Sequence, residues 1–108
     1  MSFKEVDAAK LKEMIDVEGD QLLLYDIRTP AEFQQGMIRG GKLTPLDVVP
    51  TMMQDIPTDK TIVFYCRSGV RSAQACEYVN EQLGLDTINL MGGIISWYQS
   101  GNEVIKPE

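Results

Sequence analysis

Apolar residues are grouped in short blocks along the chain, and their spacing changes from one block to the next. Segments 21–27 and 61–65 are nearly continuous apolar runs, which are typical of parallel strands buried on both faces. Two shorter runs, 42–43 and 87–90, predict further short strands. Between these runs, apolar positions recur every three or four residues, which indicates amphipathic helices.

The first two helices have recognisable start signals. Asp7 is placed to cap a helix over residues 8–15. Thr29, Pro30 and Glu32 form the pattern of a capping box with proline in the first turn. This pattern predicts a short helix that ends at about residue 35.

Three more helices are expected in the second half of the chain. One covers residues 45–53, although Pro50 within it opposes helix formation. The next runs from Ser72 to a stop at Gly84, and the last follows the glycine pair at 92–93. The apolar stripe of the helix from Ser72 consists of Cys76, Val79 and Leu83.

Helices that alternate with strands predict an α/β fold, with a central parallel sheet of about five short strands and helices on both faces. The chain of 108 residues is expected to form a single domain, residues 1–108. In such sheets, ligands bind beyond the carboxyl ends of the strands. We therefore expect the functional site where a strand ends in reactive side chains.

The composition argues against several classes of function. The net charge of −6 argues against binding to nucleic acids and anionic membranes, because both would repel the protein. No apolar run is long enough to span a membrane and residues 1–5 do not resemble a signal peptide, so a cytoplasmic location is expected. The absence of histidine excludes Cys-His and Ser-His-Asp catalysis and argues against a zinc site. We expect neither a metal nor a cofactor.

Cys66 is the strongest candidate for chemistry, because it directly follows an apolar strand. The loop of residues 66–72 contains Gly69, which permits a tight turn, and the next helix opens at its end. Backbone N–H groups and the helix N-terminus would then converge on the sulfur and favour its thiolate form. Arg67 and Arg71 are expected to add positive charge. A buried structural cysteine is the alternative, but polar neighbours on a strand-to-helix turn argue against it.

The other loop residues are candidates for binding an anion. Arg71 can hold two oxygens through its planar guanidinium group, whereas Arg67 is either a second binding group or an exposed side chain. Ser68 and Ser72 can donate hydrogen bonds to the anion, and Ser72 can alternatively cap the helix. Cys76, on the apolar side of that helix, is expected to pack in the core; a resolving thiol is the alternative, but from this side it should reach Cys66 poorly.

Four motifs, in this order, resemble those of the single-domain rhodanese-like sulfurtransferases over nearly the whole chain. They are Asp26-Ile27-Arg28, Glu32 followed by residues 36–40, the loop Cys66-Arg67-Ser68-Gly69-Val70-Arg71-Ser72, and Gly92-Gly93-Ile94-Ile95-Ser96-Trp97. The third motif fits the family's Cys-x-x-Gly-x-Arg-Ser loop closely. Met37 and Gly41 depart from the family's usual histidine and alanine, and this affects the packing of that corner rather than the chemistry.

The resemblance implies a rhodanese-like fold and a sulfurtransferase reaction. Cys66 would take a sulfane sulfur from thiosulfate or a persulfide, become a Cys66 persulfide, and pass the sulfur to cyanide or a thiol. The amides of residues 67–72 would surround the outer sulfur, and Arg71 would hold the sulfite part of thiosulfate. The expected partners are a small sulfur-containing anion or persulfide and, as a second acceptor, a protein. Asp26 and Arg28 either form a structural pair that supports the loop or are separately solvated charges.

Two alternative functions are compatible with the same residues. The domain could carry sulfur or bind a persulfide for a partner protein without turnover. A phosphatase or arsenate reductase would require a Cys-x5-Arg loop, whereas Arg71 follows Cys66 with only four residues between them. The smaller ring suits a single sulfur atom better than a tetrahedral oxyanion.

Overall fold

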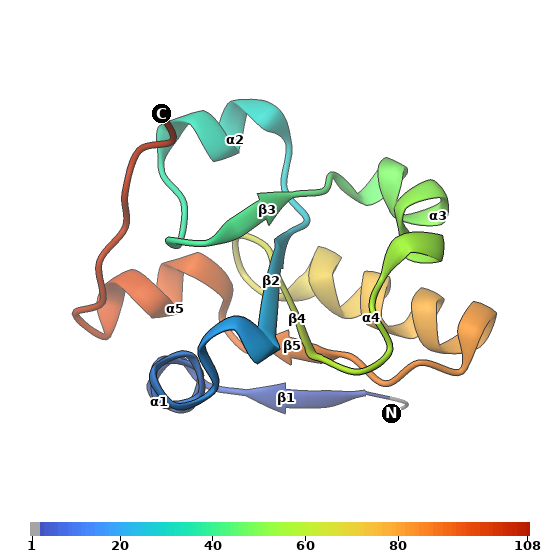
Figure 1. Ribbon diagram of the computed structural model, residues 1–108. Helices are drawn as coiled ribbons and strands as arrows, with labels where there is room; N and C mark the ends of the chain where they lie inside the picture. The colour runs from blue at the N-terminus through green and yellow to red at the C-terminus, as the bar shows by residue number, and fades with distance from the viewer. Residues whose placement is uncertain (1–2) are drawn as a thin grey trace.

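The computed structural model describes residues 3–108, which form a three-layer α/β structure (Figure 1). Met1 and Ser2, which belong to the segment compared above with signal peptides, lie outside the described residues. Within residues 3–108, five strands form one parallel sheet in the order β1-β5-β4-β2-β3. The strands are β1 Lys4–Val6, β2 Leu22–Asp26, β3 Gly41–Leu43, β4 Thr61–Tyr65 and β5 Ile88–Leu90. The predicted α/β fold with a central parallel sheet is confirmed.

Helices cover both faces of the sheet, as predicted. The helices are α1 Ala8–Glu18, α2 Pro30–Gln35, α3 Val49–Met52, α4 Val70–Leu83 and α5 Gly93–Gln99. α1 and α5 lie together on one face, whereas α3 and α4 lie on the other (Figure 1). In β4, Ile62 and Phe64 pack in the core under α3 and α4, while Val63 and Tyr65 pack in the core under α1 and α5. Alternate side chains of this strand therefore enter two separate cores, which explains its continuous apolar run.

The predicted helix caps are present. The carboxylate of Asp7 accepts a hydrogen bond of 2.8 Å from the backbone N–H of Lys10 at the start of α1. At α2, Glu32 N–H donates to the hydroxyl of Thr29, and the carboxylate of Glu32 accepts from the Thr29 N–H. These side chains satisfy N–H groups that have no partner within the helix.

Several expected elements differ from those in the structure. The short edge strand β1 was not predicted. The helix expected over residues 45–53 is broken: α3 is flanked by 3₁₀ turns at Leu46–Val48 and Met53–Asp55. Pro50 has no N–H to donate and is tolerated only in the first turn, so α3 begins immediately before it.

The helix that follows the Cys66 loop also differs from its predicted form. α4 begins at Val70 rather than at Ser72. Cys76 and Val79 are buried as expected, but Leu83 is 43% exposed and does not belong to the buried stripe. Gly84 ends the helix with a left-handed backbone (φ 65°), as predicted.

The two departures from the family pattern have a packing explanation. A Cβ atom on Gly41 would lie 2.7 Å from the hydroxyl oxygen of Tyr65, so the tyrosine occupies the space that an alanine would need. The same hydroxyl accepts a hydrogen bond of 3.2 Å from Ile38 N–H. Met37 is buried, and its backbone forms two hydrogen bonds with Ile105 near the C-terminus. Both residues therefore belong to the packing of this corner.

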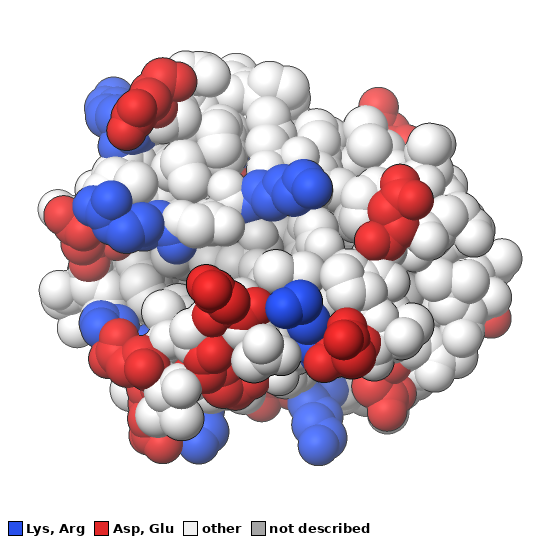
Figure 2. Space-filling model, viewed as in Figure 1, with Lys and Arg blue, Asp and Glu red and all other residues white. Residues whose placement is uncertain are grey.

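The charged surface is mixed. On the face shown in Figure 2, acidic and basic side chains lie close together over α1 and β1. On this face the acidic side chains are thus interspersed with basic ones rather than gathered in one patch. Among the residues that the structure describes, no helix has both the length and the hydropathy that crossing a membrane requires.

Candidate active site

Cys66 lies at the carboxyl end of the central strand β4, where three hydrogen-bond donors meet its sulfur. The N–H of Gly69 lies 3.1 Å from Cys66 Sγ, and the N–H and the hydroxyl of Ser72 each lie 3.4 Å from it. The Cys66 residue is only 1% exposed. The loop therefore binds the sulfur from several sides.

Gly69 allows this arrangement because it adopts a left-handed conformation (φ 100°) as the N-cap of α4. Its own N–H then points at Cys66, and the first turn of α4 brings the N–H of Ser72 to the same sulfur. The alternative role of Ser72 as the N-cap is wrong, since the cap is Gly69 and the Ser72 side chain faces the sulfur. Val70 is 63% exposed.

The sulfur is held in an environment that favours its anion. Burial disfavours a charged thiolate, but hydrogen bonds from the Ser72 hydroxyl and from the amides of Ser72, Gly69 and Ser68 outweigh this effect. The pKa of Cys66 is therefore lower than its ordinary value. A lower pKa increases the fraction of nucleophilic thiolate at neutral pH.

Arg71 is bound by an acidic side chain of another element. Its Nη1 and Nη2 donate to the two oxygens of Glu32 in α2, at 2.7 and 2.9 Å. The hydrogen bond to Glu32 raises the pKa of Arg71, burial opposes the increase, and Coulomb attraction to Glu32 and Cys66 adds to it. Glu32 therefore partly neutralises the positive charge that Arg71 was expected to add near Cys66. The groups that donate directly to the sulfur are the Ser72 hydroxyl and backbone amides.

This ion pair leads to a prediction for the pH dependence of stability. The hydrogen bond from Arg71 lowers the pKa of Glu32 from 4.5 to about 2. The charged carboxylate therefore stabilises the fold above pH 4.5, and this stabilisation is lost as the pH falls toward 2. Because the pair is partly exposed, Glu32→Gln should cost about 1 kcal/mol at pH 7.

Urea unfolding of both proteins at several pH values tests this prediction. The difference in unfolding free energy between wild type and Glu32→Gln should be constant from pH 7 to 5 and should shrink below pH 4.5. A difference that does not change with pH would show that the ion pair is not its cause.

Asp26 and Arg28 form a buried ion pair, so they are not separately solvated. Arg28 Nη2 lies 2.6 Å from the carboxylate of Asp26 and also donates to the carbonyl of Gly36 at 2.7 Å. Asp26 is paired in register with Tyr65, the residue that precedes Cys66. The pair therefore connects the end of β2 with the segment after α2, through Gly36. Through the pairing of Asp26 with Tyr65, it also lies beside the strand that leads into the Cys66 loop.

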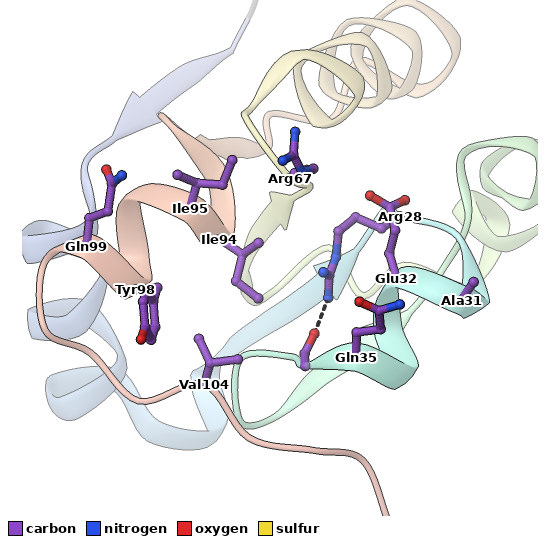
Figure 3. A pocket seen from close by; sticks show the side chains of 11 residues that line it. Arg28, Ala31, Glu32, Gln35, Arg67, Ile94, Ile95, Tyr98, Gln99 and Val104 are labelled. Carbon is purple, nitrogen blue, oxygen red and sulfur yellow. Dashed lines mark hydrogen bonds between the residues drawn. The ribbon is translucent and has the colours of Figure 1, made fainter.

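A cleft of about 630 Å³ lies between α2 and α5, beside the Cys66 loop (Figure 3). Arg67 contributes to its wall from the loop, and most of the remaining wall is apolar. Its lining residues are Arg28, Ala31, Glu32, Gln35, Gly36, Arg67, Ile94, Ile95, Tyr98, Gln99 and Val104. The cleft is large enough for a molecule much bigger than thiosulfate.

α5 is a support of the loop that the sequence interpretation missed. Ile94 N–H donates to the carbonyl of Cys66 at 2.9 Å, and Ile95 N–H donates to that of Arg67 at 3.3 Å. The glycine pair at the start of α5, Gly92 and Gly93, is the signal that could have indicated this close approach. Asn89 was also missed, because a polar residue between two apolar ones in a strand ordinarily faces solvent, whereas Asn89 is buried and hydrogen-bonded.

The second cysteine lies in a different environment. Cys76 is fully buried in the core under α4, and burial raises the pKa of its thiol to about 12. Its expected packing role agrees with this position. In residues 3–108, no group of three or more histidine, cysteine or acidic side chains is arranged to hold a metal ion.

Comparison with known proteins finds relatives along nearly the whole chain. The family model described as the rhodanese-like domain matches residues 7–100. The chain is 43% identical to a sulfurtransferase of Allochromatium vinosum over 104 residues, which cover 96% of each protein. It is 28% identical to the thiosulfate sulfurtransferase GlpE of Pseudoalteromonas translucida, over 98% of this chain and 99% of that protein. A solved structure of a rhodanese-related protein from Thermoplasma volcanium matches with a TM-score of 0.82 and 31% identity, over 94% of this chain and 97% of that one.

Proposed function

The chain belongs to the rhodanese-like domain family, and from this premise we propose that it is a sulfurtransferase that carries sulfane sulfur on Cys66. The observation that carries the proposal is the convergence of the Gly69 N–H, the Ser72 N–H and the Ser72 hydroxyl on one buried sulfur. Such a site stabilises a sulfur anion without a neighbouring base. The names of the relatives support sulfur transfer as the reaction class.

The proposed cycle has two steps. The Cys66 thiolate attacks the outer sulfur of thiosulfate, the S–S bond of thiosulfate breaks, and sulfite leaves with the electron pair. The product is a Cys66 persulfide anion. In the second step, cyanide or a thiolate attacks the outer sulfur of this persulfide, forms thiocyanate or a new persulfide, and regenerates the Cys66 thiolate. The cycle requires no external oxidant or reductant and no cofactor.

The loop residues have separate roles in this proposal. The outer sulfur of the persulfide is surrounded by the backbone amides of the loop, which are those of Arg67, Ser68, Gly69, Val70, Arg71 and Ser72. Arg71 binds the sulfite oxygens of thiosulfate, for which it must exchange its partner Glu32 for the substrate. Arg67 adds a positive charge on the side of the cleft. Asp26 and Arg28 support the strand end below the loop.

Arg71→Ala should reduce kcat/KM for thiosulfate about 10- to 100-fold, because it removes charge-assisted hydrogen bonds to the substrate. Most of the effect should be in KM, and an uncharged organic persulfide should be affected less. Steady-state release of sulfite or thiocyanate measures both constants. Arg39→Ala, which breaks an exposed pair with Glu103, is the control. If the two variants behave alike, Arg71 does not bind the anion.

The sulfur acceptor and the cellular location are also part of the proposed function. A cysteine of a partner protein can take the place of cyanide in the second step, since the cleft beside the loop accommodates a larger group than cyanide. A cytoplasmic location would keep Cys66 reduced and therefore reactive. A single domain over residues 1–108 is sufficient for both steps.

A carrier that holds the persulfide for a partner without turnover is the second candidate, because the same loop would stabilise that persulfide. Incubation with thiosulfate followed by mass spectrometry and a turnover assay separates the two functions. An enzyme should show one added sulfur on the Cys66 peptide and continuous formation of thiocyanate with cyanide. A carrier should show the added sulfur with no turnover by small acceptors. Absence of the added sulfur would contradict both.

A further inference from the structure

Asn89 in β5 is a buried polar residue whose side chain contacts the Cys66 loop. It is 1% exposed. Its Oδ1 accepts a short hydrogen bond from the hydroxyl of Ser72. Its Nδ2 donates to the carbonyl of Gly69 at 3.1 Å and to the carboxylate of Glu5 in β1 at 2.9 Å. One side chain therefore binds Gly69 and Ser72, both of which donate to Cys66.

The orientation of this amide follows from its partners. The carbonyl of Gly69 and the carboxylate of Glu5 can only accept, so both must face the NH₂ group of Asn89. The oxygen of the amide then faces Ser72, whose hydroxyl can donate. The network specifies a single orientation of Asn89.

We propose that Asn89 is a positioning residue that holds Gly69 and Ser72 where they bind the sulfur of Cys66. The inference rests on the proposed role of Cys66 as the nucleophile. Gly69 has a left-handed backbone and the largest conformational freedom of any residue type, so an anchor on its carbonyl restricts the turn. The N–H of this same glycine is the closest donor to the sulfur.

The Ser72 hydroxyl has one proton and two acceptors within reach, Asn89 Oδ1 and Cys66 Sγ. When the sulfur is a thiol, its S–H can donate to the hydroxyl oxygen while the hydroxyl donates to Asn89. When the sulfur is a thiolate, the hydroxyl donates to the sulfur instead of to Asn89, so in this form Asn89 holds the loop through its hydrogen bond to the Gly69 carbonyl. An amide oxygen does not take up a proton at ordinary pH, so Asn89 positions the hydroxyl and does not act as a base.

Charged groups of three elements lie around this network. Glu5 approaches Asn89 from β1, and Arg71 of α4, paired with Glu32 of α2, interacts electrostatically with Cys66. Replacing Asn89 by leucine keeps all of these charges. Its effect on the titration of Cys66 would therefore come from the lost hydrogen bonds.

The test is the pH dependence of alkylation of Cys66 by iodoacetamide in full-length wild type, Asn89→Leu and Asn80→Leu. The side chain of Asn80 donates a surface hydrogen bond to Asp86, away from the Cys66 loop, and Asn80 serves as the matched control. Asn89→Leu should move the midpoint to higher pH and slow alkylation at pH 7 about fivefold, with the rate at high pH unchanged. Asn80→Leu should follow wild type. Coinciding midpoints for Asn89→Leu and wild type would overturn the proposal.

A second variant and a second assay keep the result interpretable. If thermal unfolding shows that Asn89→Leu does not fold, Asn89→Ser decides, because its shorter side chain cannot reach Gly69 and Glu5 together. A shifted midpoint in this variant supports the proposal and an unshifted one overturns it. Alkylation does not depend on sulfur transfer. A shift without turnover of thiosulfate by wild type would therefore contradict the proposed function alone, and turnover without a shift would contradict the role of Asn89 alone.

Discussion

Cys66→Ser is expected to reduce sulfur transfer from thiosulfate at least about a thousandfold, because a serine hydroxyl cannot form the persulfide. The fold should be retained, since serine differs from cysteine by a single atom and can accept the same hydrogen bonds from Gly69 and Ser72. Thiocyanate release measures the loss, and mass spectrometry should find no added sulfur on the peptide that contains residue 66.

Cys76→Ser is the matched control. The Cys76 side chain is fully buried on the opposite side of α4 from solvent, and its high pKa keeps it protonated. A hydroxyl at this core position should cost about 1–2 kcal/mol of stability and leave turnover at the wild-type level. Equal activity of Cys66→Ser and wild type, or a loss found only in Cys76→Ser, would show that Cys66 is not the nucleophile.

Gly93→Ala is expected to have the second largest effect, through the backbone of the Cys66 loop. A Cβ atom at this position would lie 2.3 Å from the carbonyl oxygen of Arg67 and 2.5 Å from that of Cys66. These are backbone atoms, so they cannot rotate away as a side chain would. The loop must shift, and the positive φ of Gly93 adds further strain. We expect stability to fall by about 3 kcal/mol and kcat/KM to fall about a hundredfold.

Gly101→Ala separates the collision from the backbone strain. Gly101 also has a positive φ, 86°, but a Cβ there would meet no atom within 4 Å. This variant should lose about 1 kcal/mol of stability and keep its activity. Urea unfolding and thiocyanate release compare the two variants. If Gly93→Ala is as active as Gly101→Ala, the contact between α5 and the loop does not position Cys66.

The parts of the fold that the sequence predicted are those governed by local patterns. The apolar run before Cys66 became a central strand because both of its faces are covered. The capping box at Thr29 started α2, and Gly84 ended α4. The strand β1 was not predictable in this way, since Lys4–Val6 is a short, largely exposed edge strand without a clear alternation. This strand forms by pairing with β5. Lys4 pairs with Ile88, a residue 84 positions later in the sequence.

The same distinction applies to the site. Residues 66–72 are contiguous, so their turn and the donors around the sulfur could be expected from the sequence. The bond between Arg71 and Glu32 could not, because it joins two helices that are brought together only by the sheet. Asn89 reaches the loop from another strand for the same reason. Long-range contacts therefore determine how the predicted loop is held and how its arginine is neutralised.

The loop of residues 66–72 lowers the pKa of Cys66 and thereby favours the anionic form of its sulfur. The most direct measurement is the pH dependence of iodoacetamide alkylation, followed separately for the Cys66 and Cys76 peptides by mass spectrometry, in the folded protein and in urea. We expect a midpoint for Cys66 below the ordinary thiol value of 9.0, a return to that value in urea, and no reaction of Cys76 until the protein unfolds. A midpoint for folded Cys66 at or above its value in urea would show that the loop does not favour the thiolate.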